Sequence, residues 1–206
     1  MLRFLDRAGW ALSASLVLDC ALRASPLLAR PEPADAPDPP ADPNDWSAPA
    51  ANDFERLARD RVEVSLLRAT DLDAIAQVDR HVSGRDRRAY LGHALDEALR
   101  DSGVRISLAA RVDGVLAGFV MARADLGDFG RTEPVAVIDT VGVSPEYSQR
   151  GVGRALLEQL FLNLDALRIE RVETAVAANA FALLAFFVRA GLAPAERLAF
   201  VKRLAA

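Results

Sequence analysis

The chain has 206 residues, of which 51% are hydrophobic and 26% are charged, and 25 basic against 29 acidic side chains give a net charge of −4. This composition is that of an ordinary globular domain, and the lack of a basic excess argues against non-specific nucleic-acid binding. The single cysteine, Cys20, excludes an internal disulfide and a cysteine-based metal cage. It also fits a reducing compartment, so a cytoplasmic location is expected.

Residues 1–60 differ in composition from the rest of the chain. Residues 1–22 are mostly apolar and predict a helix, but they have neither the charge pattern of a signal peptide nor the uninterrupted length of a membrane span. Residues 26–60 are rich in proline, alanine and aspartate, and such a segment buries too little apolar surface to offset the entropy of ordering. We therefore expect a dispensable apolar helix or extension over residues 1–25, followed by a disordered linker. Attachment of residues 1–22 to a partner or a membrane surface is the alternative.

From residue 61 onward the sequence predicts one domain, residues 61–206. The expected strands cover residues 62–67, 104–112, 115–124, 134–143, 172–177 and 198–204. The expected helices cover residues 71–81, 84–100, 151–167 and 181–190. The second and third strands are joined by Asp113-Gly114, a strong hairpin turn signal. This order predicts an α/β (α+β) domain with a mixed, mostly antiparallel central sheet and helices on both faces.

The segment with the clearest chemical signal is 135–157, which reads VAVIDTVGVSPEYSQRGVGRALL and runs from a strand through a loop into an apolar helix. Gly151 and Gly153 permit a turn in which successive backbone N–H groups point outward at the positive end of a helix. Such a nest binds phosphate oxygens, and Arg150 and Arg154 can add cationic contacts. The segment therefore predicts a site for a phosphate-bearing ligand.

Three interpretations of this loop compete. A dinucleotide fingerprint needs a third glycine where Leu156 stands, and its glycines begin directly after the strand, whereas seven residues separate Val143 from Gly151. A glycine-bearing helix start without any ligand is the second interpretation. The third is a site for coenzyme A.

Residues 62–206, about 70% of the chain, resemble the GNAT family of N-acetyltransferases in the order and spacing of their elements. Residues 139–147 (DTVGVSPEY) resemble that family's fourth strand and the loop after it. Residues 148–153 (SQRGVG) resemble its pyrophosphate loop. A later motif of the family is matched by Asn179, Phe186, Phe187, Gly191 and Leu192.

The resemblance implies a GNAT-like fold that binds acetyl-CoA as a cosubstrate and needs no metal. The pantetheine arm would pair with the fourth strand, and the pyrophosphate would lie on the loop amides. The cofactor-binding residues implied are Val141, Gly142, Val143, Gln149, Arg150, Gly151, Val152, Gly153, Arg154, Ala155, Asn179 and Phe187. The chain departs from the family at Ser148, where Gln or Arg is usual, and at Phe187, where many members have a tyrosine.

The family's reaction is a direct attack of a neutral amine on the thioester, without an acyl-enzyme. We expect Asp139 to be the general base, because it is a single acid in an otherwise apolar strand, with Glu173 and Glu133 as further candidates. A solvent-facing or ion-paired Asp139 is the alternative. A backbone N–H near Val141 or Gly142 would stabilise the oxyanion.

Acceptor selection is expected at the start of the second helix, through Arg85, Arg87 and Tyr90, where three arginines (Arg85, Arg87 and Arg88) could receive a carboxylate or an acidic peptide. A solvated charged face is the alternative. The expected partners are a small-molecule amine or a peptide or protein amine, with no nucleic acid. The protein itself is expected to be a monomer or a homodimer. A GNAT fold that binds acyl-CoA as a sensor or interaction module without turnover is the alternative function.

Overall fold

The computed structural model describes residues 11–28, 62–100, 105–125, 134–196 and 200–201. Its main sheet has seven strands in the order β3-β4-β5-β6-β7-β2-β8. Neighbouring strands are antiparallel except for β6 and β7, which are parallel. The strands are β2 (Ser15–Ala21), β3 (Val62–Leu66), β4 (Arg105–Val112), β5 (Val115–Asp125), β6 (Val135–Val143), β7 (Arg171–Ala177) and β8 (Ala193–Pro194).

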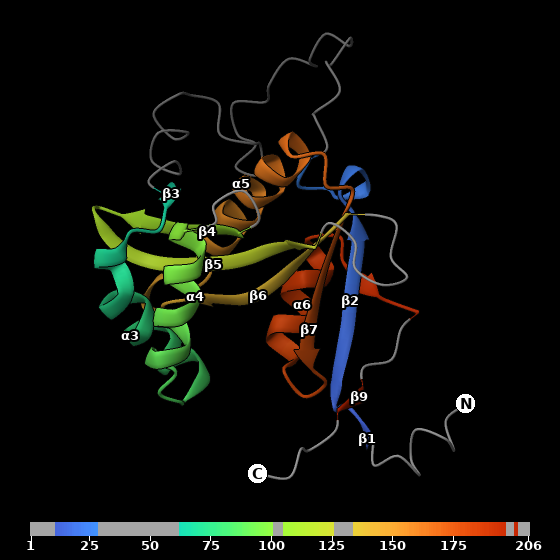
Figure 1. The fold of residues 1–206 in the computed structure, drawn as a ribbon, viewed down its shortest axis with the longest axis horizontal. Helices are drawn as coiled ribbons and strands as arrows, with labels where there is room; N and C mark the ends of the chain where they lie inside the picture. Colours follow the sequence, from blue (N-terminus) through green and yellow to red (C-terminus); the bar gives the residue numbers. More distant parts are fainter. Residues whose placement is uncertain (1–10, 29–61, 101–104, 126–133, 197–199, 202–206) are drawn as a thin grey trace, which may run out of the picture.

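Helices cover both faces of this sheet, as predicted (Figure 1). On one face lie α3 (Leu72–Ser83) and α4 (Arg88–Arg100), whose buried residues pack against Phe119 and Met121 of β5. On the other face lie α5 (Val152–Ala166) and α6 (Phe181–Arg189). Short 3-10 turns are η1 (Leu22–Ala24), η2 (Ala69–Asp71) and η3 (Pro145–Tyr147). The predicted fold class is therefore confirmed.

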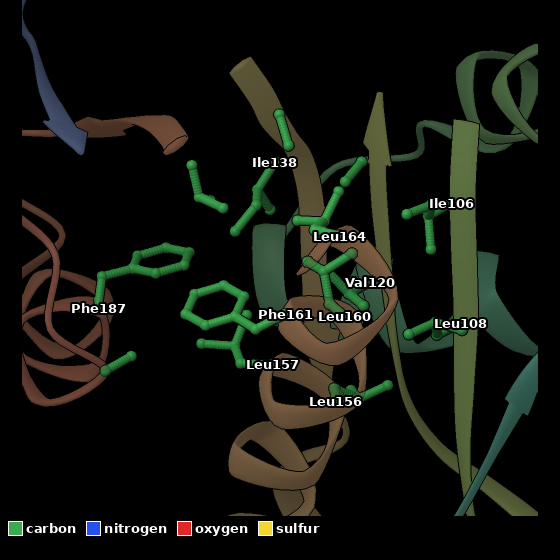
Figure 2. Packing of buried hydrophobic residues seen from close by; sticks show 14 of the residues in the cluster. Ile106, Leu108, Val120, Ile138, Leu156, Leu157, Leu160, Phe161, Leu164 and Phe187 are labelled. Carbon is green, nitrogen blue, oxygen red and sulfur yellow. The ribbon is translucent and has the colours of Figure 1, made fainter. Parts of the chain in front are cut away.

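The larger core lies between α5 and the sheet. Apolar residues recur along α5 at helical spacing and are fully buried (Figure 2), namely Leu156, Leu157, Leu160, Phe161 and Leu164. They meet Ile106 and Leu108 of β4, Val120 of β5 and Ile138 of β6. The ring of Phe187 on α6 points toward that of Phe161, so this core also joins the two helices.

The N-terminal segment corrects the sequence prediction. The helix predicted over residues 1–22 is wrong where the structure describes it, because residues 15–21 form β2 between β7 and β8 (Figure 1). Leu18, Cys20 and Leu22 are buried in the main core. The segment expected to be dispensable thus supplies an interior strand of the sheet, and the domain does not begin at residue 61.

The C-terminal strand also differs from the prediction. Instead of joining the main sheet, Phe200–Val201 (β9) pairs with Ala11–Leu12 (β1) in a separate two-stranded sheet. The place next to β7 is taken by β2, whose Cys20 lies opposite Val172. Of the predicted linker, residues 26–28 are described, with Leu27 and Leu28 packed against the core, and residues 29–60 lie outside the described residues.

Candidate active site

The parallel strands β6 and β7 are paired only over their first halves. Their register runs from Val135 opposite Arg171 to Ile138 opposite Thr174, and β6 then continues to Val143 without a partner on that side among the described residues. On its other side β6 remains paired with β5 as far as Val143. Residues 139–143 therefore present an unpaired strand edge, and these include the predicted cofactor-binding residues Val141, Gly142 and Val143.

A bulge lies where the two strands part. Met121 of β5 pairs with Thr140 and Ala122 pairs with Ile138, so Asp139 is an extra residue without a partner on β5. Thr140 points toward α4, where its Oγ1 lies 3.4 Å from the Tyr90 Oη. Asp139 lines a pocket on the same face. The bulge thus turns two successive polar side chains toward α4.

The loop after β6 forms the predicted nest of amides. Gln149 (φ 63°) and Gly151 (φ 79°) adopt the left-handed conformation, and Gly151 is the N-cap of α5. Among the described residues, the amides of Gln149 and of residues 151–154 donate to no backbone oxygen. The Ala155 amide donates to the Gly151 carbonyl at 2.9 Å, so Ala155 marks the end of this set.

Position 153 is closely packed, so a side chain there would force its neighbours to shift. A Cβ at Gly153 would lie 3.0 Å from the Phe186 ring and 3.6 Å from the Val143 Cγ2 atom. The Arg154 Nε donates to Glu158 Oε1 at 2.6 Å, and the Arg150 guanidinium lies 5.6 Å from the Tyr147 ring centroid. The two arginines thus lie at the ends of the loop, each with an intramolecular contact.

Of the two predicted acids that the structure describes, Asp139 belongs to the open edge itself and Glu173 lies on β7. The Asp139 Oδ1 is 3.0 Å from Arg123 Nη1. Burial nevertheless raises the Asp139 pKa above its ordinary value, against the opposing charges of Arg123 and Arg105. Glu173 is buried in β7 opposite Val137, and Glu133 lies outside the described residues.

Asp139 lines a pocket of about 160 Å³ between α4 and strands β4, β5 and β6. Its polar and charged lining comes from four elements and consists of Tyr90, His93, Glu97, Arg105, Ser107, Arg123 and Asp139. The structure thus brings Tyr90, predicted to contact the acceptor, to the same pocket as the predicted base. Arg105, Arg123 and Glu97 were not predicted, although an arginine within an apolar strand is the same kind of signal that identified Asp139.

The arginines predicted for the acceptor lie elsewhere. The Nε of Arg87 donates to Asp79 Oδ2 at 2.9 Å, and its Nη2 pairs with the other oxygen of the same buried carboxylate. Arg88 pairs with Asp73, and Arg85 is exposed at the start of the turn before α4. None of the three lines the pocket that contains Asp139. A role for Arg85 or Arg87 in acceptor binding stays a prediction.

Two predicted cofactor contacts lie away from the nest. Phe187 is fully buried in the main core, whereas its neighbour Phe186 lies against Gly153. Asn179 is exposed in the turn between β7 and α6. Contacts of Phe187 and Asn179 with a cofactor stay predictions. Phe186, which was not predicted to bind the cofactor, is the aromatic residue that lies against the glycine of the nest. Among the described residues, no helix could span a membrane and no cluster of metal-ligating side chains occurs.

The mixed sheet with helices on both faces defines an α/β protein, and its sheet parts beside an amide nest. More particularly, the chain belongs to the acetyltransferase (GNAT) family, whose model matches residues 70–192. No curated protein matches the chain.

Three solved structures show the same fold. A ribosomal-protein-alanine N-acetyltransferase from Brucella melitensis biovar Abortus 2308 is 21% identical, with a TM-score of 0.57 over 69% of this chain and 99% of the other. The aminoglycoside 6'-N-acetyltransferase AAC(6')-Ih from Acinetobacter baumannii is 16% identical, with a TM-score of 0.60 over 70% and 99%. The aminoglycoside N-acetyltransferase AAC(6')-Iy in complex with CoA is 18% identical, with a TM-score of 0.57 over 69% and 94%.

Proposed function

We propose that this protein transfers an acetyl group from acetyl-CoA to the amino group of an acceptor, with Asp139 as the general base. The observation that carries this proposal is the position of Asp139, a partly buried carboxylate on a bulge at the point where β6 parts from β7. The unpaired edge of β6 and the amide nest lie on the same continuous stretch of chain, residues 139–154. Membership of the GNAT family supports the same activity.

The open edge of β6 and the amide nest fit acetyl-CoA. The unpartnered amides of residues 151–154 suit a pyrophosphate, and the hydrogen-bonding edge of Val141–Val143 suits the amides of a pantetheine arm. Gly153 lets the start of α5 lie directly against Phe186, where a Cβ would be only 3.0 Å from the ring. When bound, acetyl-CoA supplies an acyl carbon activated as a thioester. A related structure of this fold holds CoA, which supports the choice.

Asp139 would accept a proton from the amine of the acceptor. An amine is a nucleophile only in its neutral form, and a carboxylate with a raised pKa is a better proton acceptor than an ordinary one. A backbone N–H near Val141 or Gly142 would donate to the carbonyl oxygen as negative charge develops there. Position 187 carries a buried phenylalanine and therefore cannot supply a proton to the departing thiolate. Solvent would protonate the thiolate instead.

Cys20 supports direct attack rather than an acyl-enzyme. Contrary to the expectation that it lies outside the domain, it is buried in β2. Burial, together with the nearby charge of Asp19, raises the pKa of the Cys20 thiol to about 11. A thiol that is neither exposed nor ionised at neutral pH is a poor nucleophile.

A cytoplasmic location and a monomeric or homodimeric state remain part of the proposal.

A sensor that binds acyl-CoA without turnover is the second candidate. The ion pair between Arg123 and Asp139 favours the sensor, because the carboxylate proposed as the base is already paired with a cation. Release of CoA thiol from acetyl-CoA, followed over a panel of small amines and peptides, separates the two. Continuous amine-dependent release supports the transferase. Tight acetyl-CoA binding by calorimetry with no release from any amine would identify the sensor.

A further inference from the structure

The pocket beside Asp139 contains two arginines in an unusual arrangement. Arg105 of β4 and Arg123 of β5 are direct cross-strand partners, so their side chains leave the same face of the sheet. Two like charges placed directly opposite each other usually destabilise a sheet. Both side chains nevertheless line the same pocket. Two neighbouring guanidinium groups that face a cavity indicate a binding role for an anion.

Each arginine has an acidic partner but retains unused donors. Arg105 Nη2 lies 2.6 Å from Glu97 Oε2, and Arg123 Nη1 lies 3.0 Å from Asp139 Oδ1. The Arg123 side chain is still 48% exposed and that of Arg105 is 28% exposed. A guanidinium has five N–H donors in a planar fork, which matches a carboxylate. The two arginines can therefore receive one further carboxylate between them.

We propose that the acceptor is a small zwitterion of the amino-acid type, whose carboxylate binds to Arg105 and Arg123 while its amino group faces Asp139. This inference rests on the proposed acetyl transfer. Because Asp139 and Arg123 are already in contact, the two groups of the acceptor have to be close together, as they are in an α-amino acid. The pocket volume of about 160 Å³ corresponds to roughly five waters at ~30 Å³ each, which suits a small molecule.

The same arrangement would link acceptor binding to activation of the base. In the free protein, Arg123 holds Asp139 in an ion pair. A carboxylate arriving on the acceptor competes for Arg123 and leaves Asp139 facing the ammonium group of the same molecule. The other charged or titratable side chains lining this pocket are Arg105, Glu97, His93 and Tyr90. An amine without a carboxylate would find Asp139 still paired.

The test compares free α-amino acids with their α-carboxamides, which keep the amine and the side chain but lack the negative charge. Initial rates of CoA release at saturating acetyl-CoA give kcat/KM for each pair. We expect at least one amino acid to exceed its carboxamide by about 10- to 100-fold, the usual value of a charge-assisted hydrogen bond. In Arg105→Gln and Arg123→Gln this ratio should fall toward one, and Arg123→Lys should restore part of it.

Arg80→Gln is the matched control, because Arg80 forms an exposed ion pair with Asp86 outside the pocket, and it should keep the wild-type ratio. If amino acids and carboxamides react equally, or if both glutamine variants keep the preference, the zwitterion inference is overturned while acetyl transfer stands. If other amines of the panel are acetylated but neither amino acids nor carboxamides are, this inference is also overturned. If acetyl-CoA binds but no amine of the whole panel is acetylated, the proposed function fails, and this inference fails with it.

Discussion

The two halves of the central sheet are assembled differently. Strands β3, β4, β5 and β6 lie side by side in chain order, and the β4–β5 hairpin turns at Asp113 (φ 52°) and Gly114 (φ 79°), as a two-residue hairpin requires. In the other half, β7 and β8 are separated by β2, which comes from the beginning of the chain. Local sequence is enough to specify the first half, whereas the second depends on contacts between distant segments. The candidate active site lies where these halves part.

The largest effect is expected from removing β2. Deletion of residues 1–28 should leave the protein unfolded, because it removes the whole length of the β2–β7 pairing and the buried side chains of Leu18, Cys20 and Leu22. Burying three such side chains contributes on the order of 5 kcal/mol, comparable with the net stability of a typical domain. Circular dichroism and thermal unfolding would measure it. A deletion variant that melts like the full chain would show that the second half of the sheet does not need β2.

Two substitutions within β2 form a matched pair. Leu18 is 1% exposed and Leu16, on the same strand, is 43% exposed. Leu18→Ala should lower the free energy of unfolding by about 2–4 kcal/mol, and Leu16→Ala by less than about 1 kcal/mol. Equal effects in urea unfolding would contradict the burial of this strand.

A substitution at Asp139 tests the candidate active site at the junction between the two halves of the sheet. Asp139→Asn should reduce kcat by about 10²-fold or more at neutral pH, with partial recovery at high pH, where free amine accumulates. Because the folded-state pKa of Asp139 is raised, its ionisation disfavours folding, so its contribution to stability is present at low pH and is lost as the pH rises through that pKa. Replacement by a neutral amide should therefore not unfold the protein at pH 7.

Rates measured from pH 6 to 10 for the wild type, Asp139→Asn and Glu173→Gln would distinguish the two described candidates. The wild-type rate should fall as the pH is lowered through the raised pKa of Asp139. An unchanged profile in Asp139→Asn, together with a loss of activity in Glu173→Gln, would assign the base to Glu173.

The amide nest belongs to the local half, and its test is a single glycine. Gly153→Val should weaken acetyl-CoA binding by about 10-fold or more, because its Cβ would lie 3.0 Å from Phe186 and the loop would have to shift, which displaces the amides of the nest. Gly92→Ala is the control, since its Cβ would make an ordinary contact with Leu72 at 3.5 Å. Calorimetry with folded protein gives both affinities. A wild-type affinity for acetyl-CoA in Gly153→Val would show that the amide nest is not the binding site for the pyrophosphate.

The smallest effect on turnover is expected at α6. Phe187→Tyr should lower stability by about 1–3 kcal/mol without raising turnover, because it places a hydroxyl in a fully buried apolar site. Phe186→Tyr, at the partly buried ring beside Gly153, should be tolerated. Steady-state rates and melting temperatures would measure both. A rise in turnover with unchanged stability in Phe187→Tyr would instead place that ring beside the thiol.

Sequence reasoning succeeded where a signal is contained in one short segment. The Asp113-Gly114 turn, α5 and the amides around Gly151 all depend on residues within a few positions of one another. It failed for β2 because Val17, on the face opposite the buried Leu18 and Cys20, is apolar too, which hides the alternation of a strand. The pocket around Asp139 was not predicted either, since Arg105 and Arg123 become neighbours only through the register of β4 and β5.

The position of β2 has a consequence for how the protein folds during synthesis. Asp19 of β2 pairs with Arg171 of β7, 152 positions later in the chain. At about 5–20 residues per second, the ribosome would release β2 some 8–30 s before its partner strand exists. During that interval β2 has neither β7 nor β8 to pair with, so its apolar side chains stay uncovered until those strands have been made. A nascent chain paused before Arg171 would therefore leave β2 accessible to a chaperone.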